Sequence, residues 1–128
     1  MTRKPVNYSK TIIYRIVCND ITITECYVGH TTDFKSRKYD HKSDCNNEKG
    51  KHYNYNIYNV IRDNGGWENW TMVQIEEFNC KNKNEASIRE RYWVEYYFST
   101  LNKQVPSRTH KEYMKTYNQK IKNEKLNL

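Results

Sequence analysis

Hydrophobic residues alternate with polar ones, or run together as β-branched and aromatic side chains, in three short segments of the chain. Residues 11–18 (TIIYRIVC) and 70–78 (WTMVQIEEF) have a composition typical of strands. Residues 21–29 (ITITECYVG) alternate well enough to predict a third strand, and Asn19-Asp20 supplies turn chemistry before it. The segments at 11–18 and 21–29 are therefore expected to form a hairpin.

Three other segments are expected to form helices. The first is expected to begin at Thr31 or Thr32 and to end near position 44. The second covers 53–64 and ends at a Gly-Gly breaker, and the third and longest covers 84–100, with Asn84 as its cap. This order of elements predicts an α+β fold, with a small three-stranded antiparallel sheet flanked by helices.

The composition sets what kind of core this fold can have. A chain of 128 residues is expected to form one domain, here at 11–102, after a polar lead-in at 1–10. Only 36% of the residues are hydrophobic and the mean hydropathy is −1.13, but 12 residues are tyrosines. Tyrosine packs through its ring while its hydroxyl finds a hydrogen-bond partner, so the core is expected to depend on tyrosines.

Positive charge is concentrated at the C-terminal end. Of the net charge of +7, residues 103–128 contribute +5, and this segment is expected to be a basic tail with helical character. Such a tail suits a polyanion, and Arg108, Lys111 and Lys115 are candidates for contacts with DNA backbone phosphates. A solvated, functionally neutral tail is the alternative.

Cysteine usage and hydropathy exclude several classes of protein. The four cysteines form no C-x-x-C pair, and no histidine cluster completes a zinc pattern. No apolar run approaches the length of a membrane span, so no membrane partner is expected. Scattered cysteines without a signal peptide predict an intracellular protein. If the protein is viral, the expected location is the cytoplasm or nucleus of the host cell.

A carboxylate lies in the middle of the apolar face of the longest predicted helix. At 100° per residue, Glu90 falls near the centre of an arc formed by Ala86, Trp93, Val94, Tyr96, Tyr97 and Phe98. A carboxylate there is unfavourable unless it is paired, protonated or bound to a metal. Two interpretations stay open: a buried salt bridge, with Arg37 as the partner, or a chemical function.

The first predicted helix places two more polar groups on its inner face. Phe34, Arg37 and His41 share a stripe, so a guanidinium and an imidazole are expected to face the sheet that carries Tyr14 and Tyr27. A guanidinium can hold a phosphate through paired hydrogen bonds, an imidazole can pass a proton, and a carboxylate can hold Mg²⁺. Metal-assisted phosphodiester hydrolysis requires this combination, although each residue alone is also consistent with a structural role.

With these residues in this order, the chain resembles the GIY-YIG nuclease family, including domains encoded by large DNA viruses and homing-type endonucleases. The first motif corresponds to Ile12-Ile13-Tyr14, with isoleucine where the family usually has glycine, and the second to Tyr27-Val28-Gly29. An arginine, a histidine, a helical glutamate and a late asparagine complete the pattern at Arg37, His41, Glu90 and Asn102.

The resemblance implies a divalent-metal-dependent endonuclease that hydrolyses DNA with low intrinsic sequence specificity. Glu90 would bind Mg²⁺ or Mn²⁺, and Arg37 would contact the phosphate. Tyr14 and Tyr27 would position or activate the attacking water with help from His41, and Asn102 would order the edge of the site. DNA would be held mainly through its backbone phosphates, with a further DNA-binding domain or a homodimer as additional partners. The alternatives are a catalytically inactive nucleic-acid-binding module of the same fold and a purely structural domain.

Overall fold

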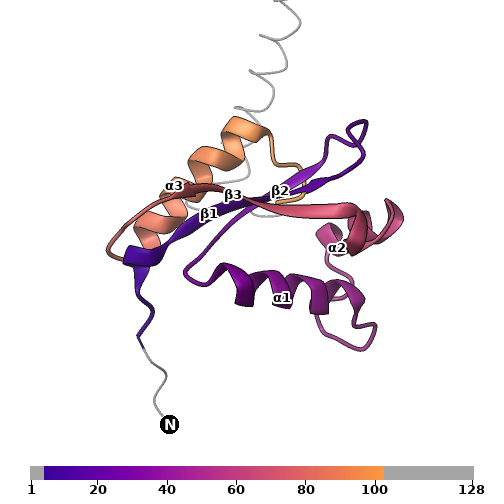
Figure 1. Ribbon diagram of the computed structural model, residues 1–128, viewed down its shortest axis with the longest axis horizontal. Helices are drawn as coiled ribbons and strands as arrows, with labels where there is room; N and C mark the ends of the chain where they lie inside the picture. The colour runs from indigo at the N-terminus through magenta and orange to yellow at the C-terminus, as the bar shows by residue number, and fades with distance from the viewer. Residues whose placement is uncertain (1–4, 103–128) are drawn as a thin grey trace, which may run out of the picture.

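The computed structural model describes residues 5–102, which form an α+β fold with a three-stranded antiparallel sheet. The strands are β1 (Ile12–Cys18), β2 (Cys26–Thr31) and β3 (Trp70–Glu77), in the spatial order β2-β1-β3. The helices are α1 (Phe34–Asn46), α2 (Asn56–Asp63) and α3 (Lys83–Tyr97), with short 3-10 turns at Tyr8–Lys10 and Trp67–Asn69. Helix α3 covers one face of the sheet, and α1 and α2 lie on the other (Figure 1). The predicted fold class is confirmed.

The second strand begins later than the sequence predicts. β2 starts at Cys26, so the expected start at residue 21 is wrong, and Ile21 is 93% exposed. The side chain of Asp20 accepts hydrogen bonds from the backbone N–H and the hydroxyl of Thr22, at 3.0 and 2.7 Å. This local turn gives the backbone an alternative to strand pairing, so the alternating residues that follow remain in the hairpin loop.

Two helix caps also differ from the prediction. Asp33 caps α1 by accepting a hydrogen bond from the N–H of Ser36 at 3.1 Å, whereas Thr31 lies outside the helix and accepts from the N–H of Asp33. Asn82, and not Asn84, caps α3 through the N–H of Glu85 at 2.9 Å. In both cases several residues have cap chemistry, and the backbone conformation selects one of them.

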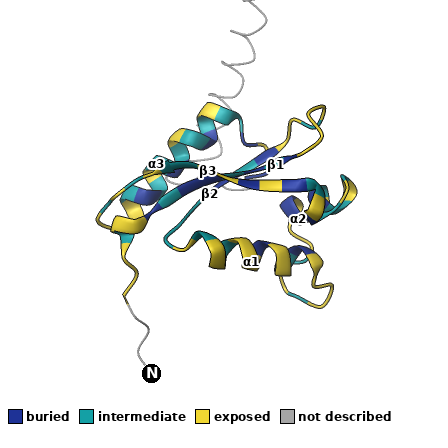
Figure 2. Cartoon of the chain, in the orientation of Figure 1, coloured by how far each residue is buried: buried dark blue, intermediate teal, exposed yellow. Residues whose placement is uncertain are grey.

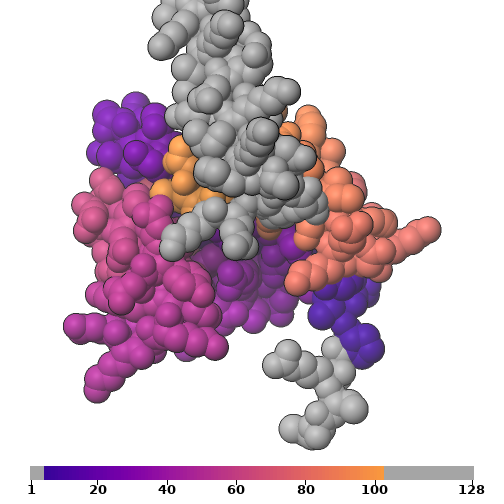
Figure 3. Space-filling view, turned by 180° about the vertical axis from the view of Figure 1, so that it is seen from behind, coloured from indigo at the N-terminus to yellow at the C-terminus, as the bar shows by residue number. Residues whose placement is uncertain are grey.

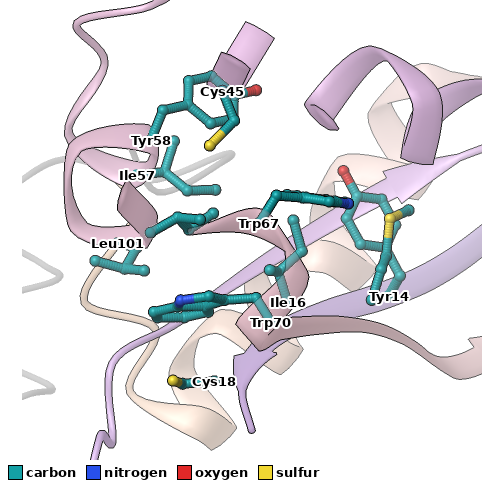
Figure 4. Packing of buried hydrophobic residues seen from close by; sticks show 11 residues of the cluster. Tyr14, Ile16, Cys18, Cys45, Ile57, Tyr58, Trp67, Trp70 and Leu101 are labelled. Atoms are coloured by element: carbon teal, nitrogen blue, oxygen red, sulfur yellow. The ribbon is translucent and has the colours of Figure 1, made fainter. Parts of the chain in front are cut away.

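Alternation along the strands divides the core into two parts. Ile13 and Val28 pack against Val94 of α3 on one face of the sheet. Tyr14, Ile16 and Cys18 point to the other face, where they join a cluster that also contains Cys45, Ile57, Tyr58, Ile61, Trp67, Trp70, Met72 and Leu101 (Figure 4). Tyrosines at the centre of this cluster confirm that the core uses phenol rings.

Helix α3 presents its buried face much as its sequence predicts. Ala86, Glu90 and Val94 are buried, while Tyr96 is 57% exposed and so does not belong to the expected apolar arc. Figure 2 shows the same division on α1, whose outward side is exposed. Within residues 5–102, no helix is long and apolar enough to cross a membrane. The predicted basic tail, with Arg108, Lys111 and Lys115, lies outside the described residues.

Candidate active site

A pocket of about 510 Å³ lies at the edge of the sheet formed by β2, where side chains from α1, α2 and α3 meet. In the view from behind, the surface is hollowed between residues around α2, in magenta, and residues of α3, in salmon (Figure 3). Five of the six predicted catalytic residues line this pocket: Tyr27, Arg37, His41, Glu90 and Asn102. The structure therefore brings together residues that are far apart in the sequence.

Tyr14, the sixth residue, lies behind the wall of the pocket. It is 1% exposed, and its ring crosses over Gly29, its partner in the β1–β2 pairing. A Cβ atom at Gly29 would lie 2.5 Å from the Tyr14 hydroxyl oxygen and 2.6 Å from Cζ. The backbone of Gly29 has no positive φ. The glycine of the second motif is therefore required by the space that the Tyr14 ring fills, and not by backbone conformation.

His41 is 1% exposed and is surrounded by the rings of Tyr14, Tyr27, Tyr58 and Trp67. Its Nε2 lies 2.7 Å from the Tyr14 hydroxyl, and its Nδ1 lies 2.9 Å from the Tyr58 hydroxyl. Burial, and secondly the charge of Arg37, lower the pKa of His41 to about 3. The ring is therefore neutral at physiological pH, so one of its nitrogens donates a hydrogen bond while the other accepts one.

The two motif tyrosines keep their protons at neutral pH. Burial raises the pKa of Tyr14 well above its ordinary value, and burial followed by the charge of Glu90 raises the pKa of Tyr27. Arg37 opposes both shifts through its charge and by hydrogen bonding. Within residues 5–102, no carboxylate forms an ion pair with Arg37, so its charge is available to an anion in the pocket.

Glu90 reaches the pocket from the opposite face of the sheet. It is 8% exposed, and its Oε1 lies 3.0 Å from Nδ1 of His30, which follows the second motif on β2. The alternative in which Glu90 pairs with Arg37 is therefore wrong. Its second oxygen, Oε2, has no hydrogen-bond partner in the described part of the chain.

No group of three His, Cys, Asp or Glu side chains in residues 5–102 could hold a metal ion by itself. The donor set nevertheless fits Mg²⁺ or Mn²⁺ in one particular way. Mg²⁺ is commonly bound by one or two carboxylates, with waters and substrate phosphates completing its coordination. Glu90 provides one such carboxylate in the pocket, with Oε2 free of protein partners in the described chain.

Asn102 attaches the segment after α3 to the outer edge of β2. Its Oδ1 accepts a hydrogen bond from the N–H of Val28 at 3.0 Å, and its Nδ2 donates to the Val28 carbonyl at 2.7 Å. The Ser99 hydroxyl also donates to Oδ1. This amide completes the backbone hydrogen bonds beside Tyr27 as a neighbouring strand would, which stabilises the strand that carries the pocket wall.

Sequence analysis missed three polar residues of this region. His30 pairs with Glu90, while Tyr58 and Asp44 extend the hydrogen bonds of His41. Tyr58 also packs in the buried cluster beneath α2. The available signal was weak: Asp44 follows His41 by one helical turn, and His30 directly follows Gly29.

Comparison with known proteins agrees with this geometry. A family model described as the GIY-YIG catalytic domain matches residues 10–104, which is most of the chain. The matched segment includes every predicted catalytic residue, from Tyr14 to Asn102. No curated protein and no solved structure matches the chain. The expected viral or homing-type origin stays a prediction.

Proposed function

The chain belongs to the GIY-YIG catalytic domain family, a family of nucleases that act on DNA, and on this premise we propose that it is a divalent-metal-dependent endonuclease. It hydrolyses phosphodiester bonds and has little sequence specificity of its own. The observation that carries the proposal is the convergence of a guanidinium, a carboxylate, a phenol and an imidazole on one pocket, at Arg37, Glu90, Tyr27 and His41.

Arg37 and Glu90 have the electrostatic roles in this proposal. The Arg37 guanidinium binds the scissile phosphate and neutralises charge that develops on it, because planar N–H donors match phosphate oxygens. Glu90 holds Mg²⁺ or Mn²⁺ through the oxygen that has no protein partner in the described chain. When bound, the cation supplies charge stabilisation at the phosphate and at the leaving oxygen. His30 keeps the Glu90 carboxylate oriented toward the pocket.

Tyr27 is the phenol that meets the attacking water, because it lines the pocket while Tyr14 lies behind it. A phenol with a raised pKa does not hold a phenolate at neutral pH, so Tyr27 takes a proton from water only while it passes its own proton on. Tyr14, whose hydroxyl is hydrogen-bonded to His41, receives that proton, and Asn102 holds the pocket edge. His41, with its pKa of about 3, acts as a neutral hydrogen-bonding group.

DNA binding by the basic tail is a separate part of the proposal. Arg108, Lys111 and Lys115 contact backbone phosphates, and so they add affinity without reading sequence. Replacing all three by alanine is expected to weaken DNA binding uniformly across sequences and to reduce the slope of log affinity against log salt by up to about 3. An unchanged slope would exclude these contacts. A further DNA-binding domain or a homodimer would supply any specificity.

The deciding experiment is nicking of supercoiled plasmid with Mg²⁺, with Mn²⁺ and with EDTA. We expect metal-dependent nicking by the wild-type protein and its loss in Glu90→Ala. The matched control is Glu77→Ala, which removes an exposed carboxylate at the end of β3 on the opposite edge of the sheet. DNA binding without nicking under both metals would contradict the proposal and favour the alternative, an inactive nucleic-acid-binding module.

A further inference from the structure

Two groups outside the family motifs extend the hydrogen bonds of the site. From Tyr14, a chain of contacts runs through His41 to Tyr58, at 2.7 and 2.9 Å, and on to Oδ2 of Asp44 at 3.5 Å. The same Oδ2 atom lies 3.3 Å from Nδ1 of His52. Tyr14 and Tyr58 are buried, whereas the side chain of Asp44 is 28% exposed and lines the pocket. The chain therefore connects a buried phenol to solvent.

The carboxylate at the end of the chain sets its direction. An ionised carboxylate only accepts hydrogen bonds, so the Tyr58 hydroxyl donates to Asp44 and its oxygen is left to accept. Nδ1 of His41 must then carry the hydrogen that Tyr58 accepts. Because the neutral ring has one hydrogen, Nε2 is free to accept from the Tyr14 hydroxyl. Without the carboxylate, the opposite direction would satisfy the same groups.

We propose that Tyr58 and Asp44 are positioning residues that hold His41 as the Nδ1–H tautomer and form the outlet for the proton removed from the attacking water. The proposal rests on the proposed nuclease function. It differs from the family pattern in assigning a role to two side chains that the motifs do not include.

Each group in the chain gains one proton and loses one. Tyr27 takes a proton from the attacking water, whose oxygen forms the new bond to phosphorus, and passes its own hydroxyl proton to the neighbouring Tyr14, whose ring centroid lies 6.3 Å from that of Tyr27. The Tyr14 proton moves to Nε2 of His41, and the Nδ1 proton moves to the Tyr58 oxygen. The Tyr58 proton then forms an O–H bond with Asp44, which releases it to solvent.

The environment of His41 favours transfer through the ring over storage of a proton on it. A ring with a pKa of about 3 does not accumulate as a cation near neutral pH. Acceptance at Nε2 with simultaneous release from Nδ1 keeps the ring neutral throughout. The low pKa that argues against His41 as a conventional general base is therefore compatible with His41 as a link between two hydroxyls.

The first test measures the tautomer directly, without any substrate. In protein carrying ¹⁵N-labelled histidine, with the His41 signals assigned by their absence in His41→Gln, we expect a protonated Nδ1 and an unprotonated Nε2. In Asp44→Asn, the amide can donate to Tyr58, so the chain reverses and the proton moves to Nε2. Tyr58→Phe removes the acceptor for Nδ1–H and should have the same effect. The matched controls are Asp40→Asn and Tyr39→Phe, on the exposed side of α1.

The second test measures single-turnover and steady-state nicking by the same variants. We expect kcat to fall about ten- to hundred-fold in Asp44→Asn and Tyr58→Phe with little change in KM, and both controls to match the wild type. A wild-type Nδ1 without a proton, or a tautomer that does not respond to Asp44→Asn, would overturn the proposal. Wild-type kcat in both variants would overturn the outlet alone. A wild-type protein that never nicks DNA would overturn both the outlet and the proposed function.

Discussion

Replacing Gly29 by alanine should destabilise the protein through one identifiable contact. The new Cβ would lie 2.5 Å from the hydroxyl oxygen of Tyr14 and 2.6 Å from Cζ, so the buried ring would have to move. Overpacking of this kind costs about 1–3 kcal/mol. Displacing the ring also breaks the bond to His41 and leaves a buried polar group unsatisfied, at about 1–3 kcal/mol. The lower chain entropy of alanine offsets roughly 0.4–1 kcal/mol.

The expected net loss is therefore about 1–5 kcal/mol in the free energy of unfolding. Urea denaturation measures it: with a slope of about 2 kcal/mol per molar, the midpoint should fall by roughly 0.5–2.5 M. Gly50→Ala is the matched control, because its new Cβ would come no closer than 3.1 Å to Asn47. If Gly29→Ala were as stable as this control, the steric explanation of the second motif would be refuted.

A double-mutant cycle isolates the contact. Tyr14→Phe removes the hydroxyl oxygen, the closest atom to the new Cβ, but keeps Cζ at 2.6 Å. Combined with Gly29→Ala, it should therefore relieve only part of the overlap, with a coupling energy of about 0.5–3 kcal/mol. Strict additivity of the two changes would mean that Gly29→Ala destabilises the protein by some route other than the Tyr14 ring.

Three further outcomes follow from the site. Glu90→Gln keeps an acceptor for His30, so the free energy of unfolding should change by less than about 1.5 kcal/mol, while nicking should be abolished. A loss of several kcal/mol in the free energy of unfolding would instead indicate that the carboxylate has a structural role. Arg37→Lys keeps the charge but loses the planar donors, and kcat should fall by at least about tenfold; an unchanged kcat would exclude the phosphate contact. Because the folded-state pKa of His41, about 3, lies below the ordinary 6.5, the unfolded chain binds the extra proton between these values. The free energy of unfolding should therefore fall as the pH drops from 6.5, by up to about 1.4 kcal/mol per pH unit. The same pH series on His41→Gln should give a flatter slope, and an unaltered slope would contradict the lowered pKa of His41.

The local sequence pattern was sufficient to predict most strands and helices. It failed where side-chain hydrogen bonds compete with the regular backbone pairing. The strands at β1 and β3 and the position of α2 follow from β-branched runs and a Gly-Gly breaker. The start of β2 did not follow, because the Asp20–Thr22 turn removes residues 21–25 from the sheet. Helix caps were displaced by one or two residues, since neighbouring residues have equivalent side-chain chemistry.

The candidate site could be predicted as a set of residues, but the contacts within it could not. Glu90 was conspicuous because a carboxylate on an apolar helical face needs a partner. That partner is His30, 60 positions away, and not Arg37. The choice between these two partners depends on the face of the sheet from which each helix approaches β2. Helices α3 and α1 lie on opposite faces (Figure 1), and the periodicity of a single helix carries no information on that arrangement.

The sequence by itself determined the α+β class, the tyrosine-based core and the identity of the polar groups, because periodicity and residue chemistry are local properties. Tertiary structure alone decided that Tyr14 lies behind the pocket while Tyr27 lines it, and that Tyr58 and Asp44 continue the hydrogen bonds of His41. These contacts join residues from separate strands and helices, such as Tyr14 and His41, which are 27 positions apart. They depend on how α1 and α2 pack across the sheet, which is set by the whole core and not by any one segment.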